Sequence, residues 1–266
     1  MTKRSLLYGA IASTSLILSL TTGLSAAPLL LVHDSSRNLA QVDVTTGDVS
    51  VIGNLGVTLT DIALDPSGNL YGISFGALYS IDLATAATTL IGAHGISGGN
   101  ALVFGADGTL YGAGGSSRSL YTIDLDSGLG SAVGTTGFAA SGDLAFNGGE
   151  LFLSSASNQL ISIDLDNGAA GTALGPFGVA NMYGLSSGTD GTLYGISGTQ
   201  VFSIDVLSGA ATLESDYGGQ GLGIAYGSSY YVSASPSDIS QPPSQVLFSL
   251  ALLALGAVLY RVKCRT

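Results

Sequence analysis

The sequence predicts an all-β fold, a single β-propeller, because one phrase recurs along the chain with a period of about 40 residues. Each copy places an aspartate inside an otherwise apolar run, as in "LYSIDLATAATTLIG" (78–92). The aspartates lie 39, 42, 40 and 41 residues apart: Asp43, Asp82, Asp124, Asp164 and Asp205. A propeller blade has this length, whereas helical repeats would place apolar residues three and four positions apart, and these units do not.

Composition agrees with many short strands joined by tight turns. The chain contains 40 glycines, its residues are 46% apolar, and only 9% are charged. Disordered chains combine low hydrophobicity with high charge, so this composition indicates a folded domain. Glycine, asparagine and aspartate supply the turns that such a fold needs.

Each repeat unit offers four strands of four to six residues. The second strand of each unit is marked by the phrases "LLLVH" (29–33), "LYGIS" (70–74), "LYGAG" (110–114), "LFLSS" (151–155) and "LYGIS" (193–197). An apolar stretch that ends in a turn precedes each of them, as in "DIALDPSGN" (61–69). Short antiparallel strands joined by such turns form a blade, and we expect five blades of four strands.

Ring closure is expected to join the two ends of the repeat region, 28–234. The innermost strands are predicted to start near Asp61, Asn100, Asp143, Tyr183 and Gly223. The fifth blade then combines "GIAY" (223–226) with the strands at 29–53, which removes open sheet edges. "YYVSA" (230–234) competes with "LLLVH" for the second strand of that blade.

The segment "DIALDPSGNLYGIS" (61–74) resembles the repeats of NHL-type and related extracellular propellers. The whole unit is similar to the "LYxIDxxTGxxTxIG" repeat of bacterial surface propellers, over most of residues 29–234. The resemblance implies the architecture and gives no ligand.

The repeated aspartate is interpreted as a structural residue. In every unit, Asp82 and its counterparts are followed by the end of a strand and a turn. An aspartate side chain accepts hydrogen bonds from backbone N–H groups two or three residues later. Glycines at 47, 128, 168 and 209 are expected to supply the positive φ that such turns require.

The two ends of the chain predict an exported protein. Residues 1–27 contain a basic start, an apolar stretch and small residues before Pro28, which is typical of a signal peptide; an uncleaved membrane anchor is the alternative. Residues 235–245 form a proline-containing linker, 246–260 a predicted transmembrane helix of about 22 Å, and 261–266 a basic tail. The positive-inside rule keeps this tail cytoplasmic and the repeats outside.

This C-terminal arrangement resembles the tripartite sorting signal of bacterial PEP-CTERM proteins, over about 25 residues. Pro242, Pro243 and Ser244 occupy the motif position, and no glutamate lies between prolines. The resemblance implies a protein of the bacterial envelope or surface, anchored at its C-terminus before any processing, and a sortase-like processing enzyme as a partner.

The charge of the chain argues against nucleic-acid binding, and its cysteine content argues against a fold stabilised by disulfides. Residues 28–241 contain all 18 acidic residues of the chain but only two basic ones, Arg37 and Arg118, which gives a net charge of −16. A phosphate-binding surface needs lysine and arginine, so we expect no nucleic acid as a partner. Cys264 is the only cysteine and lies in the basic tail, so the repeats contain no disulfide.

No pattern predicts a catalytic group, a metal site or a cofactor. "HDSS" (33–36) is interpreted as a polar hairpin loop, because residues adjacent on a strand point to opposite faces and triads are assembled in space. His94 is the only other histidine, so a zinc site rich in histidine cannot form. "DLDSG" and "DLDNG" lack the further ligands of an EF-hand.

We therefore expect a non-enzymatic surface propeller whose ligand is a glycan or a protein. The candidate ligand-binding residues are Asp61, Asn100, Asp143 and Tyr183, beside the mouth of the central channel. The predicted binding face is formed by the loops that lead to the innermost strands: 54–60, 93–99, 135–142, 175–182 and 216–221. Two alternatives stay open: a carbohydrate-active enzyme that uses channel carboxylates, for which Asp61 and Asp143 are candidates, and a calcium-dependent lectin.

Overall fold

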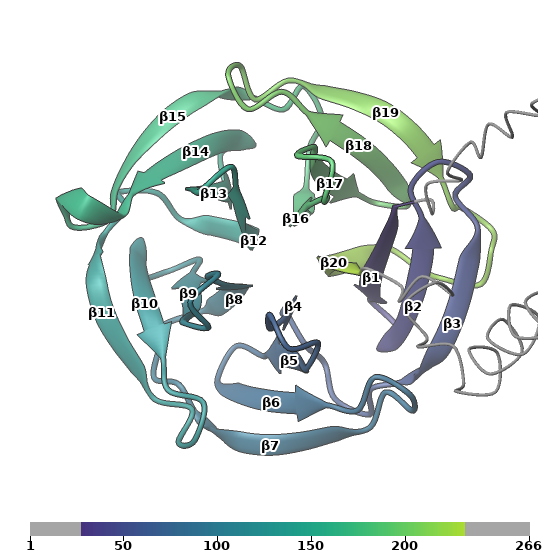
Figure 1. Cartoon of the computed structure of the whole chain (residues 1–266), viewed down its shortest axis with the longest axis horizontal. Coiled ribbons are helices and arrows are strands. Elements are labelled where there is room, and N and C mark those ends of the chain that lie inside the picture. Colours follow the sequence, from purple (N-terminus) through teal and green to yellow (C-terminus); the bar gives the residue numbers. More distant parts are fainter. Residues whose placement is uncertain (1–27, 232–266) are drawn as a thin grey trace, which may run out of the picture.

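The computed structural model describes residues 28–231, which form five sheets of four antiparallel strands around a central axis (Figure 1). The predicted five-bladed propeller is confirmed. The predicted signal peptide (1–27), linker (235–245), transmembrane helix (246–260) and basic tail (261–266) lie outside the described residues. Within residues 28–231, no helix is long and apolar enough to cross a membrane.

Four blades are continuous in sequence, and in each the chain runs from the axis to the rim (Figure 1). The first contains β4 (Asp61–Leu64), β5 (Leu70–Ile73), β6 (Ala77–Ile81) and β7 (Thr88–Ala93), and the second β8 (Gly99–Phe104), β9 (Leu110–Gly114), β10 (Ser119–Ile123) and β11 (Gly130–Thr135). The third contains β12 (Ala140–Asn147), β13 (Glu150–Ser155), β14 (Gln159–Asp164), the short 3-10 helix η1 (Leu165–Asn167) and β15 (Ala170–Pro176). The fourth contains β16 (Met182–Ser187), β17 (Leu193–Ser197), β18 (Gln200–Ile204) and β19 (Ala211–Asp216).

The fifth blade closes the ring with strands from both ends of the described chain. Its innermost strand is β20 (Ala225–Tyr231), followed by β1 (Leu29–Asp34), β2 (Asn38–Asp43) and β3 (Val49–Asn54). The predicted closure is therefore confirmed, with one correction. "YYVSA" does not compete with β1, because the innermost strand that begins in "GIAY" continues to Tyr231 and Tyr230 pairs with Leu30; residues 232–234 lie outside the described residues.

The core consists of five apolar clusters, and each fills the interface between two neighbouring blades. In one of them, Leu78 of β6 packs with Leu102 of β8 and Ile123 of β10. Blades therefore stabilise one another mainly through sheet-to-sheet burial, and the ring must close for the first and last blades to be covered.

The repeated aspartates hold the turns between the third and fourth strands, as expected. Oδ1 of Asp82 accepts hydrogen bonds from the N–H groups of Ala84 (2.9 Å) and Thr85 (3.0 Å), and the other four aspartates accept equivalent bonds. The turn glycines have φ between 62° and 78°, and Ala86 takes the left-handed conformation (φ 61°) in the unit that lacks the glycine.

A second glycine of the repeat lies where two blades touch. Gly53, Gly92, Gly134 and Gly175 follow a bulge in the outermost strands, and a Cβ atom on any of them would collide with a backbone carbonyl in the third-to-fourth-strand turn of the next blade. For Gly92 that carbonyl belongs to Ser127. This contact explains the "IG" that closes the repeat phrase.

Gly92→Ala is therefore expected to destabilise the protein by about 1–3 kcal/mol, because the outermost strand must move away from the next blade. The measurement is the midpoint of urea unfolding. Gly76→Ala, in the same blade, is the matched control, because a Cβ atom there meets nothing within 4 Å. Equal midpoints for the two variants would contradict the assigned contact.

Candidate functional site

Five backbone N–H groups, one from the innermost strand of each blade, point toward the central axis and form a ring around it. They belong to Ile62, Leu102, Leu144, Leu185 and Ser228. The innermost strand has no neighbour on its axial side, so alternate N–H and C=O groups point toward the axis. Five convergent donors would be costly to leave without acceptors in a buried place.

Asp61 and Asp143 provide the acceptors for the whole ring. Asp61 accepts from the N–H groups of Ile62 (2.8 Å) and Leu102 (2.6 Å). Asp143 accepts from three blades, through the N–H groups of Leu144 (2.7 Å), Leu185 (2.6 Å) and Ser228 (3.4 Å). Both carboxyl groups have 0% exposure. The pair thus connects all five blades at the axis.

The two carboxyls also hydrogen-bond to each other, which requires a shared proton. Burial raises the pKa of Asp61 well above its usual value, and the nearby charge of Asp143 raises it further. Burial also raises the pKa of Asp143, whereas the bonds that its carboxylate accepts act in the opposite direction. Burial therefore favours a protonated state of the pair, in which the two carboxyls share a proton.

His33 of β1 lies beside this pair. Its side chain is buried, and its Nε2 has no hydrogen-bond partner among the described residues. Burial lowers the pKa of His33 to about 4, so the imidazole is neutral. A Cβ atom on Gly227 would come within 3 Å of both Nε2 of His33 and Oδ1 of Asp61, so only glycine fits there. The neighbouring Asp34 and Ser36 form the predicted hairpin loop, in which Oδ1 of Asp34 accepts from the N–H of Ser36 (2.9 Å).

The other two predicted site residues do not reach the axial ring. The position equivalent to Asp61 is Ala101 in the second blade and Gly184 in the fourth, because bulges in β8 and β16 shift the register by one residue. Asn100 is half-buried and donates from Nδ2 to the carbonyl of Ala140 (3.1 Å). Tyr183 is half-buried, and its hydroxyl bonds Oδ1 of Asn181 (3.2 Å).

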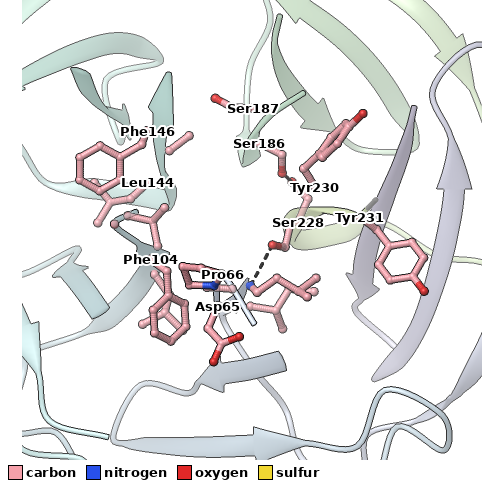
Figure 2. Close-up of a pocket in the computed structure, with 18 of the residues that line it drawn as sticks. Asp65, Pro66, Phe104, Leu144, Phe146, Ser186, Ser187, Ser228, Tyr230 and Tyr231 are labelled. Atoms are coloured by element: carbon pink, nitrogen blue, oxygen red, sulfur yellow. Dashed lines mark hydrogen bonds between the residues drawn. The ribbon is translucent and has the colours of Figure 1, made fainter. Parts of the chain in front are cut away.

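An open funnel with a volume of about 740 Å³ occupies the opposite end of the axis from the predicted binding loops. Each innermost strand begins at those loops and ends at the funnel, where the turn 65–68 forms part of its wall. Figure 2 shows the labelled side chains that line it. They come from all five blades: Asp65, Pro66, Phe104, Leu144, Phe146, Ser186, Ser187, Ser228, Tyr230 and Tyr231.

The funnel was not predicted from the sequence, although one signal was available. The residue two positions after the axial N–H group varies from blade to blade, while the glycines and aspartates of the following turn recur in most blades. Those residues are Leu64, Phe104, Phe146, Ser187 and Tyr230, and all of them line the funnel. No group of three or more potential metal-ligating side chains occurs within the described range 28–231.

No protein-family model matches the chain, and a search of curated proteins finds no match. Among solved structures, a chain of a nidogen/laminin complex is similar with a TM-score of 0.53 at 13% identity, covering 78% of this chain and 86% of that chain. A gluconolactonase from Xanthomonas campestris gives a TM-score of 0.51 at 17% identity, covering 76% of this chain and 79% of that chain. Virginiamycin B lyase from Staphylococcus aureus gives 0.45 at 13% identity, covering 70% and 69%.

The two neighbours with a TM-score above 0.5 are an enzyme and a protein of the nidogen/laminin complex, so they do not distinguish between enzymes and binding proteins. At such low identity they establish the architecture alone. The chain has the fold of the β-propellers.

Proposed function

We propose that the protein is a non-enzymatic binding propeller, displayed outside the cell, that holds its ligand in the axial funnel. The observation that carries the proposal is the character of the funnel. Its volume of about 740 Å³ lies in the range of small-molecule sites. Among the described residues that line it, Asp65 is the only charged one, and its carboxylate already accepts bonds from Ser67 and Asn69.

The burial of the carboxyl pair favours binding over catalysis. A glycoside hydrolase needs two carboxylates that reach the substrate from opposite sides of the scissile bond. Asp61 and Asp143 instead touch each other, have 0% exposure and are occupied by backbone donors. Their raised pKa values follow from this burial, and we assign the pair to holding the ring closed.

Display outside the cell is supported by the sequence patterns in residues 1–27 and 235–266. The ligand in this setting is a component of the envelope or the extracellular matrix. The sequence-predicted loop face at the other end of the axis is the competing location for a binding site.

Ser187→Trp is the variant that separates the two locations. A tryptophan there is expected to fill part of the funnel and to weaken binding of the purified full chain to envelope and matrix polysaccharide of the producing bacterium by at least about 10-fold. Leu207→Trp is the control, because Leu207 is 85% exposed on the rim and does not line the funnel. Full binding by a folded Ser187→Trp variant would move the site to the loop face.

A screen of the same full chain for hydrolase and lyase turnover tests the enzyme alternative. We expect no turnover. Activity that is lost in both Asp61→Asn and Asp143→Asn, while the unfolding midpoints stay near that of the wild type, would overturn the assignment of the pair.

A further inference from the structure

The walls of the funnel differ in chemistry from one side to the other (Figure 2). Phe104 and Phe146 form an aromatic side, and tyrosines of the preceding blades hold their rings in place: the ring centroids of Tyr71 and Phe104 lie 5.3 Å apart, and those of Tyr111 and Phe146 5.6 Å apart. Such pairs keep an apolar ring surface fixed at the wall.

The other side carries the hydroxyl groups of several serines, together with Tyr230 and Tyr231 (Figure 2). The Oγ atoms of Ser186 and Ser228 lie 2.9 Å apart, and Ser229 Oγ accepts from the N–H of Leu64 (3.0 Å). Ser187 Oγ has no hydrogen-bond partner among the described residues. This Oγ atom is itself buried, so it meets a ligand only after the side chain turns to another of its three staggered positions, toward the funnel.

Backbone groups add further donors and acceptors. The N–H of Leu64 points to the axis, two residues after that of Ile62, as the alternation of an edge strand requires. The same alternation, two residues after the axial N–H groups of the other four blades, turns the N–H and C=O groups of Phe104, Phe146, Ser187 and Tyr230 toward the axis. The funnel therefore offers both donors and acceptors without charge.

Charge restricts the ligand further. No lysine, arginine or histidine is found among the described residues of the funnel wall, and residues 28–241 carry a net charge of −16. An anionic ligand would meet repulsion and no counter-charge. A cation would meet only Asp65, whose oxygens are engaged in its own turn. An uncharged ligand with an apolar face and many hydroxyls would match the aromatic side of the funnel, its hydrogen-bonding groups and its lack of basic residues.

We propose that the funnel binds an uncharged saccharide. One face of a sugar ring lies on Phe104 and Phe146, and its hydroxyls bond the serine side and the strand edges. This inference rests on the proposed function, since it names the ligand class of the same site.

The experiment is a glycan array probed with the full chain, with neutral and acidic oligosaccharides and with a parallel set of uncharged aromatic compounds, in the presence and absence of EDTA. We expect neutral glycans to bind, acidic ones not to bind, and EDTA to have no effect. Phe146→Ala should weaken binding by at least about 10-fold. Ser187→Ala should weaken it by about 2- to 10-fold. Phe75→Ala, which removes a 67% exposed ring elsewhere, is the control and should bind as the wild type does.

The outcomes separate this inference from the proposed function. Binding restricted to acidic glycans, binding abolished by EDTA, or binding of the aromatic compounds alone that Ser187→Trp abolishes would each overturn the saccharide while leaving the funnel as a site. Glycan binding that neither Ser187→Trp nor Phe146→Ala reduces, in variants with unchanged unfolding midpoints, would overturn both.

Discussion

Asp143→Ala is expected to lower the free energy of unfolding by about 3–5 kcal/mol, because it leaves the other half of a buried, proton-sharing pair without its partner. It also removes the acceptor for the N–H groups of Leu144, Leu185 and Ser228, which come from three blades. Each buried donor left without an acceptor costs about 1–3 kcal/mol. Urea unfolding at constant pH measures the loss.

Asparagine at position 61 provides the matched comparison. An amide in place of the Asp61 carboxyl keeps one acceptor oxygen and a donor toward Asp143. Asp61→Asn should therefore cost about 1–2 kcal/mol, clearly less than Asp61→Ala. If both alanine variants cost under about 1 kcal/mol, the pair does not hold the ring together.

The pH dependence of stability is the second large expected effect. Burial raises the pKa of Asp61, so the folded protein keeps a proton that the unfolded chain releases above about pH 4. The stabilisation is complete below that pH and is lost as the pH rises toward the pKa of the pair in the folded protein. The free energy of unfolding should fall by about 1.4 kcal/mol per pH unit across that window.

Other groups act in the opposite direction, but at lower pH. The pKa of His33 is lowered to about 4 by burial, so protonation of the unfolded chain destabilises the fold only below about pH 6.5. Hydrogen bonds in their turns lower the pKa values of Asp82, Asp124 and Asp205, so these residues lose their contribution only in acid. Above about pH 7, these groups no longer contribute to the slope.

Urea unfolding of the wild type and of Asp61→Asn at several pH values from about 5 upward therefore isolates the pair, because the other groups contribute to both curves alike. The wild type should lose stability steadily over this range, while Asp61→Asn, which has no proton to release, should show a much smaller slope. Parallel curves for the two proteins would show that the pair holds no proton in the folded state.

The strand framework could be predicted because one unit repeats. The period, the turn aspartates such as Asp82 and the turn glycines all follow from local rules that every blade obeys, so five copies reinforce one another. The closing strand was harder, because β20 contains no repeat phrase and its boundaries depend on pairing with β1.

The candidate site depended on features that a repeat conceals. A bulge adds one residue to a strand, and no residue pattern in the sequence reveals it. Asn100 and Tyr183 were therefore aligned with Asp61, although Ala101 and Gly184 occupy the equivalent positions. The direct contact between Asp61 and Asp143 joins blades that are not sequential, and no local pattern reports it. The positions equivalent to Asp61 and Asp143 in the other three blades hold the small residues Ala101, Gly184 and Gly227. These small residues are the only sign of the contact in the sequence.

The funnel is formed by side chains near the ends of the five innermost strands. These side chains differ between blades, because hydrogen bonds between the strands already fix the backbone there and the fold does not require one residue type. Phe104 and Ser187 occupy equivalent positions and face one cavity only once the ring is closed. Sequence reasoning pointed to the loops at the opposite end, since those differ most in length.

A crystal structure of the full chain with the neutral oligosaccharide that binds best tests the account most directly. We expect a sugar ring in the funnel, with one face against Phe104 and Phe146 and its hydroxyls toward Ser186 and Ser187. A sugar seated instead on loops 54–60, 135–142 and 175–182, with the funnel holding only solvent, would contradict it.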